Sequence, residues 1–297
     1  MVTLSSLQRF LGALGTATDI VFDTYILQAR GKVFRALEAA CRRGAHVVVR
    51  VARDPYENPD GSSRNVDAVD ALRALGADAR VTENTHLKGA LLDGVGFVDD
   101  CNWKQDGSDT ILRDDSPDDI RMIHDAAAGR IDPGTSTFAT RKDDALAEEK
   151  ALFASSGSAE DIIVETESIS FGSLTWELGT LAKEKHCHVR LIVNTYDLAK
   201  PGGYREAEVL KWLEKSGVAV HLSSATEKFA IVGQAAWIGS ANLSIEDARL
   251  RKAHPGMPDT IEWGARTSDR AINEHLRTVF EKRWEKSQDV MPEDVRT

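Results

Sequence analysis

The stretch Thr85–Trp103, THLKGALLDGVGFVDDCNW, carries the pattern that decides the fold of this chain. It contains His86, Lys88 and Asp93 in the spacing H-x-K-x4-D, with Asn102 nine residues further on. Apolar residues on both sides of a glycine predict two short strands joined by a turn. Side chains two apart on a strand point to the same face, so His86 and Lys88 should lie together. A histidine beside a fixed positive charge suits attack on a phosphorus atom.

A second stretch, Thr226–Asn242 (TEKFAIVGQAAWIGSAN), repeats this spacing about 140 residues later. The flanking sequence repeats as well. Two pairs of segments match at nearly the same offset: DIVFDTYI at Asp19–Ile26 with DIIVETES at Asp161–Ser168, and HVVVRV at His46–Val51 with HVRLIV at His188–Val193. Two long copies indicate a duplicated α/β unit rather than a solenoid of many short repeats.

Together the two stretches resemble the phospholipase D superfamily, whose signature is H-x-K-x4-D followed by G-S-x-N. The resemblance covers nearly the whole chain, because both halves share the order of strands and helices as well as the motif. The first half supplies a complete H-x-K-x4-D, and the second supplies a complete G-S-x-N in Gly239, Ser240 and Asn242. Thr226 and Gly233 stand where the second histidine and the second aspartate belong.

This resemblance implies an α/β fold made of two pseudo-symmetric phospholipase D-like domains, each a mixed, mostly parallel sheet flanked by helices. Alternating strand and helix patterns along the chain agree with a sheet covered on both faces. We expect an N-terminal domain at residues 1–140 and a C-terminal domain at residues 141–297. The segment Arg130–Thr140 carries Gly, Pro, Ser and Thr and is predicted to lie between them. Leucines and a phenylalanine at helical spacing near the N-terminus predict an amphipathic helix that packs on the first sheet.

The family's chemistry is a two-step displacement at phosphorus. One histidine attacks to give a phosphohistidine, and the other protonates the leaving oxygen and then activates water or an alcohol. The resemblance makes His86 the nucleophile and Lys88 and Lys228 the phosphate-binding lysines. It also implies that an acid at the strand after G-S-x-N orients each histidine from the opposite half. Glu262 would orient His86, and Asp109 is the matching acid of the first half.

The remaining motif positions divide into phosphate donors and structural residues. Further phosphate donors would be Asn102, Ser240 and Asn242. They and the two lysines are expected to face His86 across the domain interface. Asp93 is interpreted as a structural residue of the hairpin. The resemblance implies no metal and no other cofactor.

Three departures from the signature bear on activity. Thr226 cannot act as a general acid or base, a role typically worth about 10²–10⁴ in rate. Asp99 and Asp100 stand where the first half should have Gly and Ser, and they bring negative charge to a phosphate site. Either another group supplies the proton, with His221 as a minor candidate, or two chains associate as a homodimer and share sites, or hydrolysis is largely lost.

Composition limits the kinds of partner and location that we expect for this chain. The chain has 297 residues, 42% of them hydrophobic, and a formal net charge of −10, which argues against a broad nucleic-acid-binding surface. Its three cysteines form no even framework and fit a cytoplasmic location. No stretch reaches the ~18 apolar residues of a membrane-spanning helix.

The leading hypothesis is therefore a phospholipase D-like phosphodiesterase that acts on a phospholipid head group or a related phosphodiester. A catalytically impaired pseudoenzyme that serves as a binding or scaffold module is the main alternative. A nuclease of the same superfamily is the second alternative.

Overall fold

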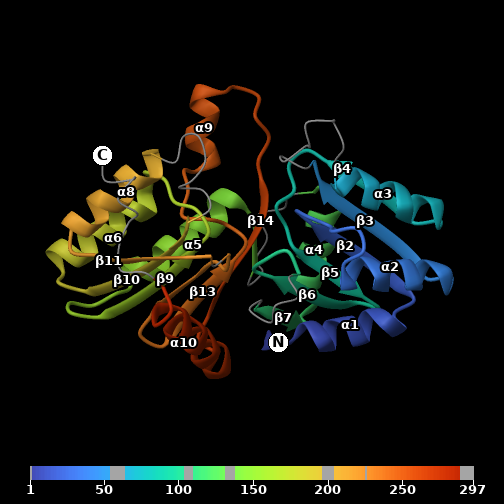
Figure 1. The fold of residues 1–297 in the computed structure, drawn as a ribbon, viewed down its shortest axis with the longest axis horizontal. Helices are drawn as coiled ribbons and strands as arrows, with labels where there is room; N and C mark the ends of the chain where they lie inside the picture. The colour runs from blue at the N-terminus through green and yellow to red at the C-terminus, as the bar shows by residue number, and fades with distance from the viewer. Residues whose placement is uncertain are drawn as a thin grey trace. The chain divides into compact units, whose positions relative to one another are not determined.

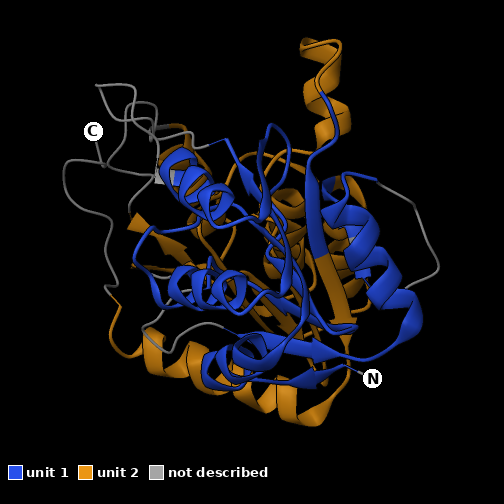
Figure 2. Ribbon diagram, turned by 90° about the vertical axis from the view of Figure 1, so that its right-hand side faces the viewer, with its two compact units in different colours: residues 1–142, 258–263 blue, residues 143–257, 264–297 orange. Residues whose placement is uncertain are grey.

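The computed structural model describes residues 2–53, 64–103, 110–130, 138–195, 204–224 and 226–287. The chain divides into two compact units, which Figure 2 colours separately. Unit 1 contains Met1–Lys142 together with Pro258–Trp263, and unit 2 contains Asp143–Met257 together with Gly264–Thr297. The short segment Pro258–Trp263 thus packs with the first half of the chain although it lies far along the second half.

Each half builds a seven-stranded sheet (Figure 1). The first has the order β1-β7-β6-β5-β2-β3-β4. Its strands are β1 (Thr3–Leu4), β2 (Asp19–Thr24), β3 (His46–Ala52), β4 (Asp78–Thr82), β5 (Gly89–Leu92), β6 (Val95–Asp99) and β7 (Ile111–Asp114). The strands of the second are β8 (Phe138–Arg141), β9 (Asp161–Thr166), β10 (His188–Asn194), β11 (Ala219–Ser223), β12 (Phe229–Val232), β13 (Ala235–Gly239) and β14 (Ile261–Thr267).

The second sheet repeats the first strand for strand. Its order, β11-β10-β9-β12-β13-β14-β8, is that of the first sheet read from the β4 edge. The register repeats too: Asp19 pairs with His46 between β2 and β3, and Asp161 pairs with His188 between β9 and β10. The pseudo-symmetric α/β fold expected from the sequence is therefore confirmed.

Both sheets are mixed, as expected, but less parallel than expected. In the first sheet β2, β3 and β4 are parallel, whereas β5 pairs antiparallel with β2 and with β6, and β7 pairs antiparallel with β6 and with β1. The cause is the tight hairpin of the motif. Asp93 and Gly94 adopt φ angles of 49° and 80°, which reverse the chain within two residues.

Helices flank each sheet (Figure 1). Those numbered before β8 are α1 (Leu7–Thr16), α2 (Lys32–Arg42), α3 (Arg64–Ala74) and α4 (Pro117–Ala127). Those numbered after it are α5 (Lys142–Ala154), α6 (Ser173–Glu184), α8 (Tyr204–Lys215), α9 (Asp247–Ala253) and α10 (Arg270–Trp284).

The main core of unit 1 lies between one face of its sheet and α1, α2 and α3. Phe10 and Leu14 of α1 are completely buried in it, which confirms the expected amphipathic helix. On the other face α4 contacts β2, β5 and β6. There Gly96 lets α4 approach closely, because a Cβ atom at this position would lie 3.0 Å from Cδ1 of Ile123.

Two elements differ from the sequence-based expectation. The end of the predicted inter-domain segment forms β8, an edge strand of the second sheet, because its β-branched and aromatic residues pair beside β14. The short helix α9 follows the second motif, where no helix was predicted. No helix in the described part of the chain combines the length and the apolar character needed to cross a membrane.

Candidate functional site

His86 lies in an extended segment between β4 and β5 that runs beside the first residues of β14. Its backbone N–H donates to the carbonyl oxygen of Ile261 over 2.7 Å, and Ile261 N–H donates to Asn84 O over 2.9 Å. Thr85 and Ile261 form a parallel bridge. These backbone contacts fix residue 262 next to the histidine and explain why Pro258–Trp263 belongs to unit 1.

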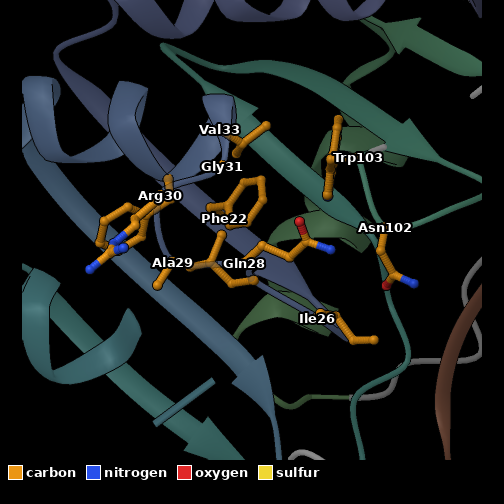
Figure 3. A pocket seen from close by; sticks show the side chains of 11 residues that line it. Phe22, Ile26, Gln28, Ala29, Arg30, Gly31, Val33, Asn102 and Trp103 are labelled. Carbon is orange, nitrogen blue, oxygen red and sulfur yellow. The ribbon is translucent and has the colours of Figure 1, made fainter. Parts of the chain in front are cut away.

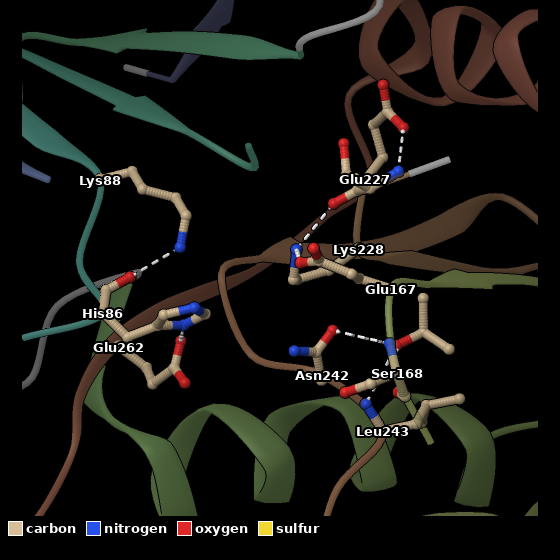
Figure 4. A network of polar contacts seen from close by, with 11 residues as sticks. His86, Lys88, Glu167, Ser168, Glu227, Lys228, Asn242, Leu243 and Glu262 are labelled. Atoms are coloured by element: carbon tan, nitrogen blue, oxygen red, sulfur yellow. Dashed lines mark hydrogen bonds and ion pairs between the residues drawn. The ribbon is translucent and has the colours of Figure 1, made fainter. Parts of the chain in front are cut away.

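The side chains of His86 and Glu262 meet in this arrangement (Figure 4). Nδ1 of His86 lies 2.8 Å from Oε2 of Glu262, within the hydrogen-bonding distance expected for an orienting acid. The two side chains are 16% and 5% exposed. Because an ionised carboxylate only accepts, Nδ1 carries the hydrogen, and Nε2 keeps the lone pair that a nucleophile needs.

Tyr25 is a second neighbour of His86 that the sequence analysis did not identify. Its ring packs edge-on against the imidazole, with the ring centroids 4.5 Å apart. The buried Asn65 holds the backbone at Tyr25 and just after it, since Nδ2 donates to Tyr25 O over 2.8 Å and Oδ1 accepts from Leu27 N over 2.9 Å. The tyrosine directly follows β2, so only its place in the repeat could have pointed to it.

Lys88 is completely buried, and its position is fixed by its immediate neighbours. Nζ donates to the carbonyl oxygen of His86 over 2.9 Å and lies 5.6 Å from the centroid of the Tyr25 ring. An ammonium group over an aromatic face is stabilised by the ring quadrupole. Histidine, lysine, tyrosine and Glu262 thus form one cluster in unit 1.

Asp23 on β2 adds a buried carboxyl group near this cluster. It accepts a 2.6 Å hydrogen bond from Thr85 Oγ1, and its Oδ2 lies 3.5 Å from Nη1 of Arg50. Burial raises the pKa of Asp23 to about 7, although Arg50, Thr85 and Lys88 all act to lower it. The first half therefore holds a carboxyl group that titrates near neutral pH beneath its motif.

Lys228 occupies the matching place in unit 2 and is 1% exposed. Its Nζ donates to the carbonyl oxygen of Thr226 over 2.6 Å, as Lys88 does to residue 86. It also lies 2.9 Å from Oε2 of Glu167, and Figure 4 shows this pair. Glu167 was not identified from the sequence, although it aligns with Tyr25 in the repeat.

The predicted phosphate donors differ between the halves. Oδ1 of Asn242 accepts hydrogen bonds from Ser168 N over 3.2 Å and from Thr166 Oγ1 over 3.4 Å. Asn242 therefore ties the loop after β13 to the end of β9. Ser240 is completely buried nearby in sequence.

Asn102 is half-buried and borders a cavity of about 710 Å³ in unit 1 (Figure 3). The cavity lies between the end of β2, the first turn of α2 and the residues that follow β6. Phe22, Val33 and Trp103 contribute to its wall. Within the described ranges, Oδ1 of Asn102 has no hydrogen-bond partner.

The acidic motif positions bind backbone groups. Oδ1 of Asp93 accepts from the N–H groups of Thr18 and Asp19, each over 2.9 Å, and these bonds lower its pKa. Oδ2 of Asp99 accepts from Trp103 N over 2.6 Å, and Oδ1 of Asp100 accepts from Thr110 N over 3.0 Å. Asp93 thus anchors the hairpin to the start of β2, and the other two carboxylates hold the backbone N–H groups of Trp103 and Thr110.

Two further sequence-based candidates, Gly233 and His221, contact residues other than the motif lysines and His86. Gly233, the counterpart of Asp93, has a φ of 56°, and its carbonyl oxygen accepts from Nη2 of Arg277 over 2.6 Å. His221 stacks on Trp284 at 3.6 Å on the edge strand β11, separated from the second motif by two strands. Asp109 lies outside the described residues. Among the residues described, no three His, Cys, Asp or Glu side chains are grouped to hold a metal ion.

Comparison with known proteins bears on the fold. No protein-family model matches the sequence, and no curated protein matches it significantly. Phosphatidylserine synthase from Haemophilus influenzae Rd KW20 matches with a TM-score of 0.64 and 12% identity, over 96% of this chain and 85% of that one. Polyphosphate kinase from Porphyromonas gingivalis matches with a TM-score of 0.63 and 13% identity, over 95% of this chain.

The chain spans 50% of the length of that polyphosphate kinase. Both structures have phospholipase D-superfamily folds. This chain therefore shares the fold of these two structures, in agreement with the fold that the two motifs led us to expect.

Proposed function

We propose that this protein is a phosphodiesterase of phospholipase D type that uses His86 as its nucleophile. The observation that carries the proposal is the 2.8 Å contact between His86 and Glu262, beside the buried Lys88. Such a contact fixes the ring with its hydrogen on Nδ1 and its lone pair on Nε2, while the ammonium supplies the positive charge that a phosphate oxygen needs.

The proposed reaction has two displacements at phosphorus. In the first, Nε2 of His86 bonds to phosphorus as the bond to the leaving oxygen breaks, which gives a phosphohistidine. In the second, the oxygen of water or an alcohol bonds to phosphorus as the P–N bond breaks, and its proton passes through solvent to the oxygen that left in the first step, which restores the histidine. Lys88, together with Lys228 and the two motif asparagines, would hold the phosphate oxygens during both steps.

The substrate that we propose is a phospholipid head group or a related phosphodiester. The net charge of −10 disfavours a nucleic acid, since a polyanion would be repelled. The phosphatidylserine synthase shares the fold and is of similar length, which supports a lipid-type phosphodiester.

The test is turnover of three substrates: bis(p-nitrophenyl) phosphate, phosphatidylcholine and single-stranded DNA. We expect the first two to be cleaved by the wild type and not by His86→Ala. His254→Ala, which removes an exposed histidine, is the matched control and should leave turnover unchanged. Rates that do not depend on His86, or cleavage of DNA alone, would contradict the proposal. Trapping of an acid-labile, base-stable phosphoprotein that is lost in His86→Ala would support the covalent step.

A binding or scaffold module is the second candidate function. Thr226 offers no proton, and the lysine next to it is already bound to Glu167, so the second half resembles a site that has stopped catalysing. If the wild type turned over none of the three substrates but bound a phospholipid vesicle, the scaffold would be favoured.

A further inference from the structure

The carboxylate of Glu167 is paired with the ammonium group of Lys228, which the family motif assigns to phosphate binding. Oε2 lies 2.9 Å from Nζ of Lys228, and the same Nζ donates to Thr226 O over 2.6 Å. The lysine side chain is 1% exposed, so both contacts are made by a buried ammonium group. A carboxylate oxygen and a phosphate oxygen need the same donor and the same charge, so they compete for this lysine.

Glu167 is held at this point by its neighbours in the chain. On one side Thr166 Oγ1 accepts from Leu243 N over 3.1 Å, and on the other Ser168 N donates to Asn242 Oδ1 over 3.2 Å. The loop after β13 thus holds the side chain of the residue before the glutamate and the backbone N–H of the residue after it. The side chain itself is 33% exposed, so it can also leave the lysine for solvent. A fixed backbone with a partly exposed carboxylate suits an anion that can be displaced.

The matching position in unit 1 is built differently. Tyr25 follows β2 as Glu167 follows β9, and it presents an aromatic ring to Lys88 at 5.6 Å. A ring stabilises an ammonium group without neutralising its charge, whereas a carboxylate neutralises it. The residue that follows β2 therefore presents a neutral ring to its motif lysine, whereas the residue that follows β9 presents a carboxylate.

We propose that Glu167 is a resident anion on Lys228, which a phosphate group must displace before the second motif can bind it. The proposal rests on the proposed function, because it takes Lys228 as a phosphate-binding lysine. It adds that the second motif is closed at rest and that one carboxylate closes it. Ligands with more negative charge than a single diester, such as a phosphate monoester or inorganic phosphate, displace it more readily.

The test is binding of inorganic phosphate by calorimetry at constant ionic strength, in a Lys88→Met background that removes the other motif lysine. We expect weak binding by Lys88→Met, at least ~10-fold tighter binding by Lys88→Met/Glu167→Gln, and loss of the gain when Lys228→Met is added. Glu208→Gln, which removes an exposed glutamate of α8 in the same unit, is the matched control and should change nothing. An equal gain in this control would assign the effect to net charge and overturn the proposal.

Removing the carboxylate leaves a buried ammonium without this partner, so a second variant guards against unfolding. Glu167→Tyr installs the residue found in the first half and should also bind phosphate more tightly. Phosphate should raise the melting temperature of either Glu167 variant more than that of the wild type. If both variants fold and neither gains affinity, the proposal is wrong. Loss of turnover in Glu167→Gln without a gain in phosphate affinity would instead assign Glu167 to proton transfer.

These outcomes are separate from the test of the proposed function. The phosphate measurements need no turnover, whereas the proposed function depends on the loss of turnover in His86→Ala. An inactive wild type with a Glu167-dependent phosphate site would retain this inference and favour the scaffold. If turnover depended on His86 but the Glu167 variants gained no phosphate affinity, the proposed function would be supported and this inference would be wrong.

Discussion

Lys88 and Lys228 occupy matching places in the two halves, and each donates to the carbonyl oxygen two residues earlier. What surrounds them differs. The first lysine lies beside a histidine and over an aromatic ring, and the second lies beside a threonine and against a carboxylate. The duplicated fold therefore preserves the backbone setting of the lysine, while single side chains decide whether the half can bind and attack a phosphate.

A buried acid on β2 and its counterpart on β9 give a second comparison. Asp23 on β2 pairs with Arg50 of the neighbouring strand, whereas Glu165 on β9 pairs with Arg283 of α10. Arg283 also contacts Glu227, which replaces the apolar Leu87 of the first motif. Burial raises the pKa of Glu165 well above its ordinary value, and the nearby Glu227 raises it further. The second half thus buries an additional carboxylate where the first half has apolar packing.

Replacing Glu262, the acid that orients His86, should give the largest loss of turnover, because it removes a contact that only the first motif makes. Glu262→Gln keeps the shape but no longer favours the His86 tautomer with hydrogen on Nδ1. By analogy with loss of the acid in a catalytic triad, kcat should fall by about 10³–10⁴, with KM little changed. Steady-state kinetics with bis(p-nitrophenyl) phosphate measures both.

Glu83→Gln is the control for this prediction, because Glu83 is an exposed glutamate of the same unit that pairs with Arg53 at the surface. Its kcat should match the wild type. A kcat for Glu262→Gln within about threefold of the wild type would show that the contact with His86 is structural only.

The matched spacing of the repeat made the fold predictable, and the resemblance to the phospholipase D superfamily pointed to Glu262 as the acid that orients His86. The residues that contact the lysines were not predictable in the same way. Tyr25 and Glu167 lie outside the motif. Secondary-structure propensity does not predict that a side chain after one strand will contact a lysine that is far away in the sequence. The place of Pro258–Trp263 in unit 1 depends on backbone pairing beyond the second motif, which periodicity does not encode.

The buried acid of the first half should give the protein a pH-dependent stability. The pKa of Asp23 is raised from 3.8 to about 7, so the folded chain keeps a proton that the unfolded chain releases between these values. The free energy of unfolding therefore decreases as the pH rises from about 4 to 7. In Asp23→Asn this contribution is absent, and the decrease should be smaller by up to about 4 kcal/mol.

Urea unfolding of the wild type and of Asp23→Asn, from about pH 4 to 7, measures this difference in the free energy of unfolding. Glu165 titrates in both, so its contribution cancels in the comparison. Parallel pH profiles for the wild type and Asp23→Asn would contradict the raised pKa.

Restoring the missing histidine of the second motif should make the two halves more alike. Thr226→His supplies a group that can protonate a leaving oxygen, so an unactivated alkoxide should benefit most. Turnover of phosphatidylcholine should rise by up to ~10², and that of bis(p-nitrophenyl) phosphate by much less, since p-nitrophenolate leaves without a proton. Thr226→Gln, similar in size but unable to transfer a proton, is the control. Equal gains on both substrates would point to altered binding instead.

The smallest expected effect concerns Asp100, which stands where the second half has Ser240. Asp100→Ser removes a negative charge and should tighten inorganic phosphate binding by a few-fold, because like charges repel. The size is limited because the carboxylate is buried and its Oδ1 already accepts from Thr110 N over 3.0 Å, so the same change should cost about 1–2 kcal/mol of stability. Phosphate titration and urea unfolding on one preparation separate the two effects.

Asp99→Asn is the control for this prediction, since it removes a neighbouring charge while an amide oxygen can still accept from Trp103 N. Tighter binding in both variants would assign the effect to charge, whereas a gain confined to Asp100→Ser would assign it to the position that the serine occupies in the second half.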